Sequence, residues 1–330
     1  MARRRRIRGG GQKKQTLQDW LLAEEYSLAL APAFFGFFAY VGALKALHEA
    51  DLLKNVKYLS GASAGAMVAG MLAAGMSPDQ MASVIVTLDR KSFWDPPAIG
   101  GLLKGKKFQD LIDNNLPVKT FEECETPVAV TGFNLLGFRT EIIDRGSLAD
   151  AIVASATFPG MFAPVFRKGS LLIDGGVCDP CGLMGIRMAG GAKGQKARIL
   201  NLGLNNSQPW GPNDIRHSIL RSDGSVANSD LEVVSLYCSD LPKPSPFALE
   251  EGAKAIDAGY NIVKDLLRCP LEGFLQSPGH YVIQVTGGGL PSPSPTKERK
   301  RHYLGLQSPQ GSKKSKIIKN NEDAPIANVC

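Results

Sequence analysis

The sequence predicts an α/β protein with a mostly parallel sheet covered by helices on both faces. Short apolar runs alternate with segments of helical periodicity along most of the 330 residues, which is typical of such folds. Glycine is abundant, at 36 residues with many in the middle third, and this favours tight strand-to-helix turns over a helical bundle. An apolar fraction of 44% with 21% charged residues fits a globular core.

The expected elements follow in chain order. Helical segments carry apolar residues on one face, as at Val41, Leu44 and Leu47, and the strands are short apolar runs bounded by turn residues. We expect helices at 16–26, 38–51, 64–74, 78–90, 108–114, 147–156 and 247–267. We expect strands at 28–31, 56–59, 128–133, 139–143, 171–173, 199–204, 233–237 and 281–285. Residues 91–106 form a connection rich in Pro and Gly.

Charge divides the chain into one folded domain, 16–290, between a disordered basic arm, 1–15, and a disordered basic tail, 291–330. The first 14 residues carry +7 and residues 296–330 carry +5, so the rest is net −5 within a total of +7. A net negative domain repels phosphate backbones, which argues against a nucleic-acid partner. The two ends could contact an anionic membrane peripherally. Alternatively, they are solvated tails that carry a nuclear or nucleic-acid signal.

The sequence indicates neither a secretory signal nor a membrane-spanning helix. The arginine run at 3–6 has no apolar stretch behind it. No run of about 18 apolar residues is uninterrupted. We therefore expect a soluble intracellular protein, in contact with membranes only peripherally, while the compartment and the oligomeric state stay open.

The six cysteines are dispersed, which predicts reduced, buried thiols. Cys178 and Cys181 form a lone C-x-x-C, and zinc would need two more ligands in a similar cluster. We predict no metal site and expect this pair to be structural or at most a labile disulfide.

The clearest chemical motif is Gly61-Ala62-Ser63-Ala64-Gly65, between an expected strand and an expected helix. This context makes G-x-S-x-G a nucleophile elbow, in which a strained turn exposes the serine hydroxyl at the strand end. Gly61 and Gly65 keep side chains from colliding across the turn. The alternative is a helix start rich in Gly and Ala that contains an ordinary serine.

A serine hydroxyl needs a base that takes its proton. Asp174 follows the apolar run 171–173 and precedes Gly175 and Gly176, which let the chain turn sharply. If Asp174 and Ser63 lie at the same edge of one parallel sheet, their separation of 111 positions in the sequence is no obstacle. A carboxylate in an apolar pocket has a raised pKa and is a better base at neutral pH. Read alone, Asp-Gly-Gly is an ordinary turn.

Together these motifs resemble the serine–aspartate dyad of the patatin-like phospholipases. The stretches 154–159, 162–165 and 172–177 are similar to the run before the aspartate of that family, and 41–47 is similar to its first helix. The resemblance is strongest over 28–185. It implies a patatin-like fold, Ser63 as nucleophile, Asp174 as base, and no metal or organic cofactor.

The oxyanion loop departs from the family pattern. The family has G-G-G-x-R-G, whose backbone N–H groups hold the oxyanion, whereas this chain has Pro32-Ala33-Phe34-Phe35-Gly36-Phe37. We expect a variant loop in which N–H groups near Phe35 and Gly36 donate. Losing one such donor costs about 100- to 1000-fold in rate.

The resemblance thus implies a lipid acyl hydrolase that cleaves fatty-acyl esters of phospholipids or related lipids. One alternative is a Ser–Asp–His triad with His280, the histidine that precedes the last expected strand. Another is a pseudoenzyme with a patatin fold that binds lipid or protein without turnover. The lipid class, the acyl position and the activity of the variant loop are not determined by the sequence.

Overall fold

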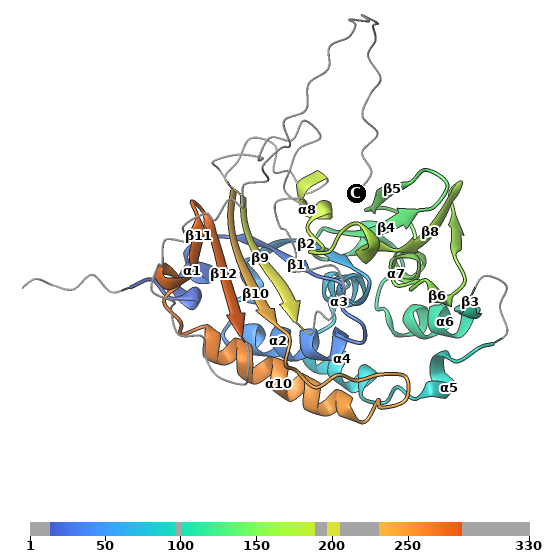
Figure 1. The fold of residues 1–330 in the computed structure, drawn as a ribbon, viewed down its shortest axis with the longest axis horizontal. Coiled ribbons are helices and arrows are strands. Elements are labelled where there is room, and N and C mark those ends of the chain that lie inside the picture. The colour runs from blue at the N-terminus through green and yellow to red at the C-terminus, as the bar shows by residue number, and fades with distance from the viewer. Residues whose placement is uncertain (1–13, 97–100, 189–196, 205–230, 286–330) are drawn as a thin grey trace, which may run out of the picture.

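The computed structural model describes residues 14–96, 101–188, 197–204 and 231–285, drawn in colour in Figure 1. A ten-stranded sheet crosses the described part of the molecule, and a two-stranded sheet lies apart from it. The order of the large sheet is β11-β12-β10-β9-β1-β2-β4-β8-β7, with β5 beside β4. The predicted disordered tail at 291–330, and all but the last two residues of the predicted arm, lie outside the described ranges.

Twelve strands and nine α-helices have described bounds. The strands are β1 (Tyr26–Leu30), β2 (Val56–Ala62), β3 (Gly101–Leu103), β4 (Val128–Asn134), β5 (Arg139–Ile143), β6 (Gly160–Phe162), β7 (Val165–Arg167), β8 (Ser170–Asp174), β9 (Ala197–Leu204), β10 (Leu231–Cys238), β11 (Leu275–Ser277) and β12 (His280–Val285). The α-helices are α1 (Leu17–Ala23), α2 (Phe37–Glu49), α3 (Ala64–Ala73), α4 (Pro78–Ile85), α5 (Arg90–Phe93), α6 (Lys106–Asn115), α7 (Leu148–Ser155), α8 (Met184–Met188) and α10 (Glu251–Leu266).

The sheet is mostly parallel, as predicted, and is buried on both faces. Strands β12, β10, β9, β1, β2 and β4 all pair in parallel. Leu28 and Leu30 of β1 contribute to the large core, while Ala29 between them contributes to a smaller core on the other face. Because side chains alternate along a strand, this pattern assigns the two cores to the two faces of the sheet.

Different helices cover the two faces. Helices α2 and α10 pack along one face, and α8 lies over the other (Figure 1). Residues Ala255, Ile256, Val263 and Leu266 of α10 are buried, at the spacing of one face of a helix. The sheet covered on both faces agrees with the predicted α/β class.

Several element boundaries differ from the sequence prediction. The helix expected at 78–90 ends at Ile85, because Asp89 caps a second short helix, α5, through a capping box with Ser92. The helix expected at 247–267 begins only at Glu251. Strands β3, β6, β7 and β11 have three residues each and were not predicted, because three residues are too few to show an alternating pattern.

The end of β2 and the end of β8 meet along one edge of β4. Thr131 of β4 pairs with Ala62 of β2, and the next residue, Gly132, pairs with Asp174 of β8. β2 runs parallel to β4 and β8 runs antiparallel to it, so the two carboxyl ends point at each other. We predicted that both motifs lie at one edge of a parallel sheet; instead, an antiparallel strand brings the second motif to the first.

None of the helices in the described ranges has both the length and the apolar character that a bilayer crossing requires.

Candidate active site

Ser63 occupies the turn between β2 and α3. Its backbone has φ 55° and ψ −122°, a left-handed conformation that a residue with a side chain rarely adopts. The Ser63 N–H donates to Oγ of the buried Ser155 at 2.9 Å. The strand–turn–helix context predicted for Gly61–Gly65 is therefore present, and a side-chain hydrogen bond from α7 supports the strained turn.

The two glycines of this turn allow backbone segments to approach closely. A Cβ atom on Gly65 would lie 2.1 Å from the carbonyl oxygen of Leu30. A Cβ atom on Gly61 would lie 2.4 Å from the carbonyl carbon of Gly65. Atoms cannot approach this closely, so a side chain at Gly65 would force the elbow away from β1, and a side chain at Gly61 would force β2 away from the start of α3.

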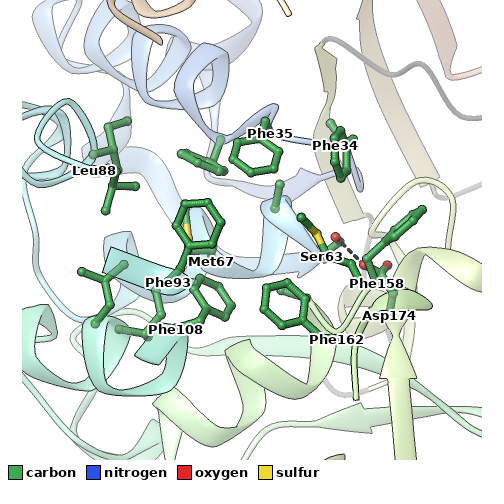
Figure 2. A pocket seen from close by; sticks show the side chains of 18 of the residues that line it. Phe34, Phe35, Ser63, Met67, Leu88, Phe93, Phe108, Phe158, Phe162 and Asp174 are labelled. Atoms are coloured by element: carbon green, nitrogen blue, oxygen red, sulfur yellow. Dashed lines mark hydrogen bonds between the residues drawn. The ribbon is translucent and has the colours of Figure 1, made fainter. Parts of the chain in front are cut away.

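The Ser63 hydroxyl donates a hydrogen bond to Asp174, with 2.6 Å between Oγ and Oδ2, and the dashed line in Figure 2 marks it. The other oxygen of Asp174, Oδ1, accepts the N–H of Gly176 at 2.8 Å. The Asp174 N–H donates to the Thr157 carbonyl at 2.9 Å. The carboxylate is thus fixed by the turn that follows it and by the end of α7.

The turn after Asp174 is as crowded as the serine elbow. A Cβ atom on Gly175 would lie 2.1 Å from the Thr131 carbonyl oxygen, and one on Gly176 would lie 2.6 Å from Cβ of Pro32. The Asp-Gly-Gly turn therefore packs against β4 on one side and against the loop that follows β1 on the other.

Burial raises the pKa of Asp174 to about 6, while the hydrogen bonds from Ser63 and Gly176 act in the opposite direction. The residue is only 4% exposed, so the charged form loses most of its hydration. A carboxylate with this pKa is ionised at neutral pH and holds a proton more readily than an exposed aspartate does. This combination suits a general base.

A pocket of about 110 Å³ opens beside the dyad. Its lining includes Ser63 and Asp174, and every other described side chain that lines it is apolar. The apolar members are Ala33, Phe34, Phe35, Phe37, Ala64, Met67, Met71, Val84, Ile85, Leu88, Phe93, Phe108, Leu111, Ile112, Ala156, Phe158, Met161 and Phe162. A single water needs only about 10–15 Å³ of such space. The pocket therefore suits an apolar chain whose polar end reaches the dyad.

The dyad lies at one end of this pocket. Phe34 and Phe158 stand beside Ser63 and Asp174, with ring centroids 5.6 Å apart (Figure 2). These two rings are 43% and 45% exposed, so they form the rim of the pocket toward solvent. Leu88 lies at the opposite end (Figure 2).

His280 does not join the dyad. It begins β12, four strands away from β2 in the sheet, which corresponds to roughly 19 Å at about 4.8 Å per strand. All strands between them are parallel, so His280 lies at the amino end of the sheet and Ser63 at the carboxyl end. The triad alternative is therefore excluded by the topology.

Within the described ranges, no group of three or more His, Cys, Asp or Glu side chains is arranged to hold a metal ion. Cys181 is buried and is not part of a disulfide, so Cys178 and Cys181 form no disulfide with each other.

Part of the chain matches a known protein family. Residues 28–185 match the sequence model of the family described as patatin-like phospholipase. This segment, just under half of the chain, is therefore similar to the patatin-like phospholipases. The patatin-like segment runs from β1 through the Asp-Gly-Gly turn to α8 and so contains both members of the dyad.

The relatives match about half of this chain rather than the whole of it. An uncharacterized NTE family protein of Mycobacterium bovis is 31% identical over 158 residues, which are 47% of this chain and 43% of that protein. An uncharacterized protein of Acanthamoeba polyphaga mimivirus is 28% identical over 170 residues, 46% of this chain and 57% of that protein. The matches therefore span about half the length of these relatives.

A solved structure shares the patatin-like fold. VipD from Legionella pneumophila superimposes with a TM-score of 0.51 at 16% identity, and the match covers 74% of this chain and 67% of that chain. At this identity the likeness concerns the fold alone.

The loop that follows β1 differs from the patatin-like pattern in its hydrogen bonds as well as its sequence. The Gly36 N–H donates to the Ala33 carbonyl at 3.0 Å, so it is not available to an oxyanion in this conformation. Phe35 has φ 53°, which is strained for a bulky residue. Among the described residues, no hydrogen bond engages the N–H of Phe35 or Ala64, and both residues line the pocket.

Sequence reasoning missed three contributors to the patatin-like site. Ser155 and Thr157 hold the backbones of Ser63 and Asp174, yet they entered the sequence analysis only as part of a family-like run. Ala64 is the first residue of α3, so its N–H has no partner within the helix. The elbow motif could have drawn attention to the Ala64 N–H, because in such elbows the residue after the nucleophile commonly supplies an oxyanion donor.

Proposed function

We propose that this protein is a lipid acyl hydrolase that cleaves fatty-acyl esters of phospholipids or related lipids, with Ser63 as nucleophile and Asp174 as base. The observation that carries the proposal is the hydrogen-bonded pair at the end of an otherwise apolar pocket. An ester carbonyl at Ser63 would leave its acyl chain among apolar side chains, where burial is favourable. The patatin-like family supports the same class of reaction.

The first half of the reaction transfers the acyl group to the enzyme. Asp174 accepts the Ser63 proton as Oγ attacks the carbonyl carbon and forms a tetrahedral intermediate. The bond to the leaving alcohol breaks, and the alcohol takes the proton from Asp174. An acyl-serine remains.

The second half returns the enzyme to its starting state. Asp174 accepts a proton from water, and the resulting hydroxide oxygen attacks the acyl-serine carbonyl. The bond to Ser63 Oγ breaks, Oγ takes back the proton from Asp174, and the fatty acid leaves.

The oxyanion of both intermediates is held by backbone donors. We assign this role to the N–H groups of Phe35 and Ala64, since both residues line the pocket and their N–H groups are not engaged by other described residues. Ala64 also begins α3, whose amino end carries a partial positive charge that favours an anion. This revises the sequence expectation, in which Gly36 was a donor.

Labelling with an alkyl fluorophosphonate tests the proposal directly. The reagent should attach to Ser63 and block hydrolysis, and mass spectrometry of the digested protein should locate it there. Ser60, three residues earlier on β2, is fully buried, so Ser60→Ala should keep both labelling and activity. Stoichiometric attachment at any other residue, or none at all, contradicts the assignment.

Activity should rise with pH through about 6, because only ionised Asp174 can accept the proton and its pKa is raised to about 6. Below the midpoint, kcat/KM should fall about tenfold per pH unit, and above pH 7 it should be flat. A neutral short-chain ester followed from pH 4 to 8 measures this profile. Asp179, a second buried acid with its pKa raised to about 6, holds the N–H groups of Leu183 and Met184. Asp179→Asn should therefore keep the midpoint of the pH profile. A shifted midpoint in that variant would show that the titration belongs to Asp179 and not to Asp174.

One observation favours a second candidate, a patatin-like fold that binds lipid without turnover. The Gly36 N–H is already engaged by Ala33, so the loop offers fewer oxyanion donors than the family pattern supplies. This candidate predicts fatty-acid binding with no fluorophosphonate labelling, so the same labelling experiment separates the two.

A further inference from the structure

The pocket continues well past the dyad, along helix α3. Ala64, Met67 and Met71 line it at spacings of three and four, which places them on one face of the helix. From Ser63 to Met71 is eight residues, or about 12 Å at roughly 1.5 Å per residue. The space beside Ser63 is therefore elongated and parallel to α3.

The far part of the pocket is closed by a different part of the chain. Val84 and Ile85 of α4, Leu88 in the turn after it, and Leu111 and Ile112 of α6 line this part. Figure 2 shows Leu88 at the end opposite Ser63, with Met67, Phe93 and Phe108 between them. All these side chains are apolar, so the far part offers no polar partner to a head group or a leaving alcohol.

Resting on the proposed function, we propose that this pocket takes the acyl chain and that Leu88, together with Leu111 on α6, sets the preferred chain length. Carbon–carbon bonds of about 1.5 Å in a zigzag advance roughly 1.3 Å per carbon. A channel of about 12 Å then holds an extended chain of about eight to ten carbons. The preferred substrate is therefore an ester of a medium-chain fatty acid, and a butyryl ester fills only the part next to the dyad.

Leu88 is well placed for a test because it is only half-buried and belongs to a turn rather than to the core of a helix. Tryptophan at this position would occupy the end of the channel without touching Ser63. Val86, two residues earlier, is 52% exposed and does not line the pocket. Val86→Trp is therefore a matched control that adds the same side chain to the same segment.

The experiment compares p-nitrophenyl butyrate with p-nitrophenyl decanoate, which share one leaving group. Leu88→Trp should lower kcat/KM for the decanoate at least tenfold and change the butyrate value less than twofold. Val86→Trp should change neither. Equal losses on both esters, or an unchanged decanoate value, overturn the inference. If Leu88→Trp does not fold, Leu111→Trp places the same bulk in the far part of the channel from α6 and should give the same split.

The failure of this inference and the failure of the proposed function are distinguishable. If the wild-type protein hydrolyses both esters and the variants do not discriminate between them, the chain-length assignment alone is wrong. If the wild-type protein hydrolyses neither ester, the proposed function fails. The affinity for decanoate, measured by calorimetry, then still tests the pocket. Leu88→Trp should bind decanoate at least tenfold more weakly than Val86→Trp does. Equal affinities of the two variants overturn the inference.

Discussion

Replacing Ser63 by alanine is expected to lower the hydrolysis of acyl esters by about a million-fold in kcat, the loss typical of removing a nucleophilic serine. No other described hydroxyl can substitute for it, because Ser63 and Asp174 are the only polar side chains among the described residues that line the pocket. Residual hydrolysis should come only from the remaining oxyanion donors and from substrate binding. Release of p-nitrophenol from a short-chain ester, measured at high enzyme concentration, can detect a loss of this million-fold size.

The alanine variant should fold as the parent does, because the backbone contacts that hold the elbow are unchanged. The Ser63 N–H still donates to Ser155, and Gly65 still fits against Leu30. Circular dichroism and a thermal melt check this, and Ser60→Ala is the matched control for removing a serine hydroxyl from the same strand–turn segment. Activity in Ser63→Ala within tenfold of the parent would refute the nucleophile assignment.

The sequence predicts those parts of the site that depend on local geometry. A serine between glycines, after an apolar strand and before a helix rich in alanine, is enough to indicate the elbow, because the crowding that demands Gly61 and Gly65 arises within a few residues and the neighbouring strand. Gly175 and Gly176 are required for the same kind of reason. Alternation of apolar runs and helices likewise sufficed for the α/β class.

Long-range pairings could not be read from the sequence in the same way. β8 pairs antiparallel with β4, and this places Asp174 opposite the end of β2. The five-residue apolar run of β8 fits a parallel or an antiparallel strand equally well. The hydrogen bond between Ser63 and Ser155 joins residues 92 positions apart, and no local pattern encodes such a contact.

The pocket wall was the least predictable part. Leu88 and Leu111 look like ordinary core residues in the sequence, and only the packing of α4 and α6 around α3 turns them toward one lumen. A substrate channel and a hydrophobic core use the same side chains, so apolar periodicity cannot separate them. The sequence could not show that the Gly36 N–H, expected to be an oxyanion donor, is engaged by Ala33, because this hydrogen bond depends on the tertiary shape of the turn.

Asp174→Asn is expected to lower kcat about ten-thousand-fold while leaving the fold intact, as the same change does to an orienting carboxylate in a catalytic triad. The amide matches the carboxylate in shape, and its oxygen can still accept the Gly176 N–H that Oδ1 accepts now. Its NH₂ group then faces Ser63 Oγ, where the parent presents the acceptor Oδ2. A donor at this position cannot take the serine proton, so attack on the ester lacks its base.

Single-turnover measurements of acyl-enzyme formation should show the loss in the first half of the reaction, and the rise of activity through pH 6 should disappear. Asp179→Asn removes a second buried charge but should leave the acylation rate within a few-fold of the parent, since Asp179 does not line the pocket. Acylation by Asp174→Asn at more than a tenth of the parental rate would mean that the serine proton leaves by another route.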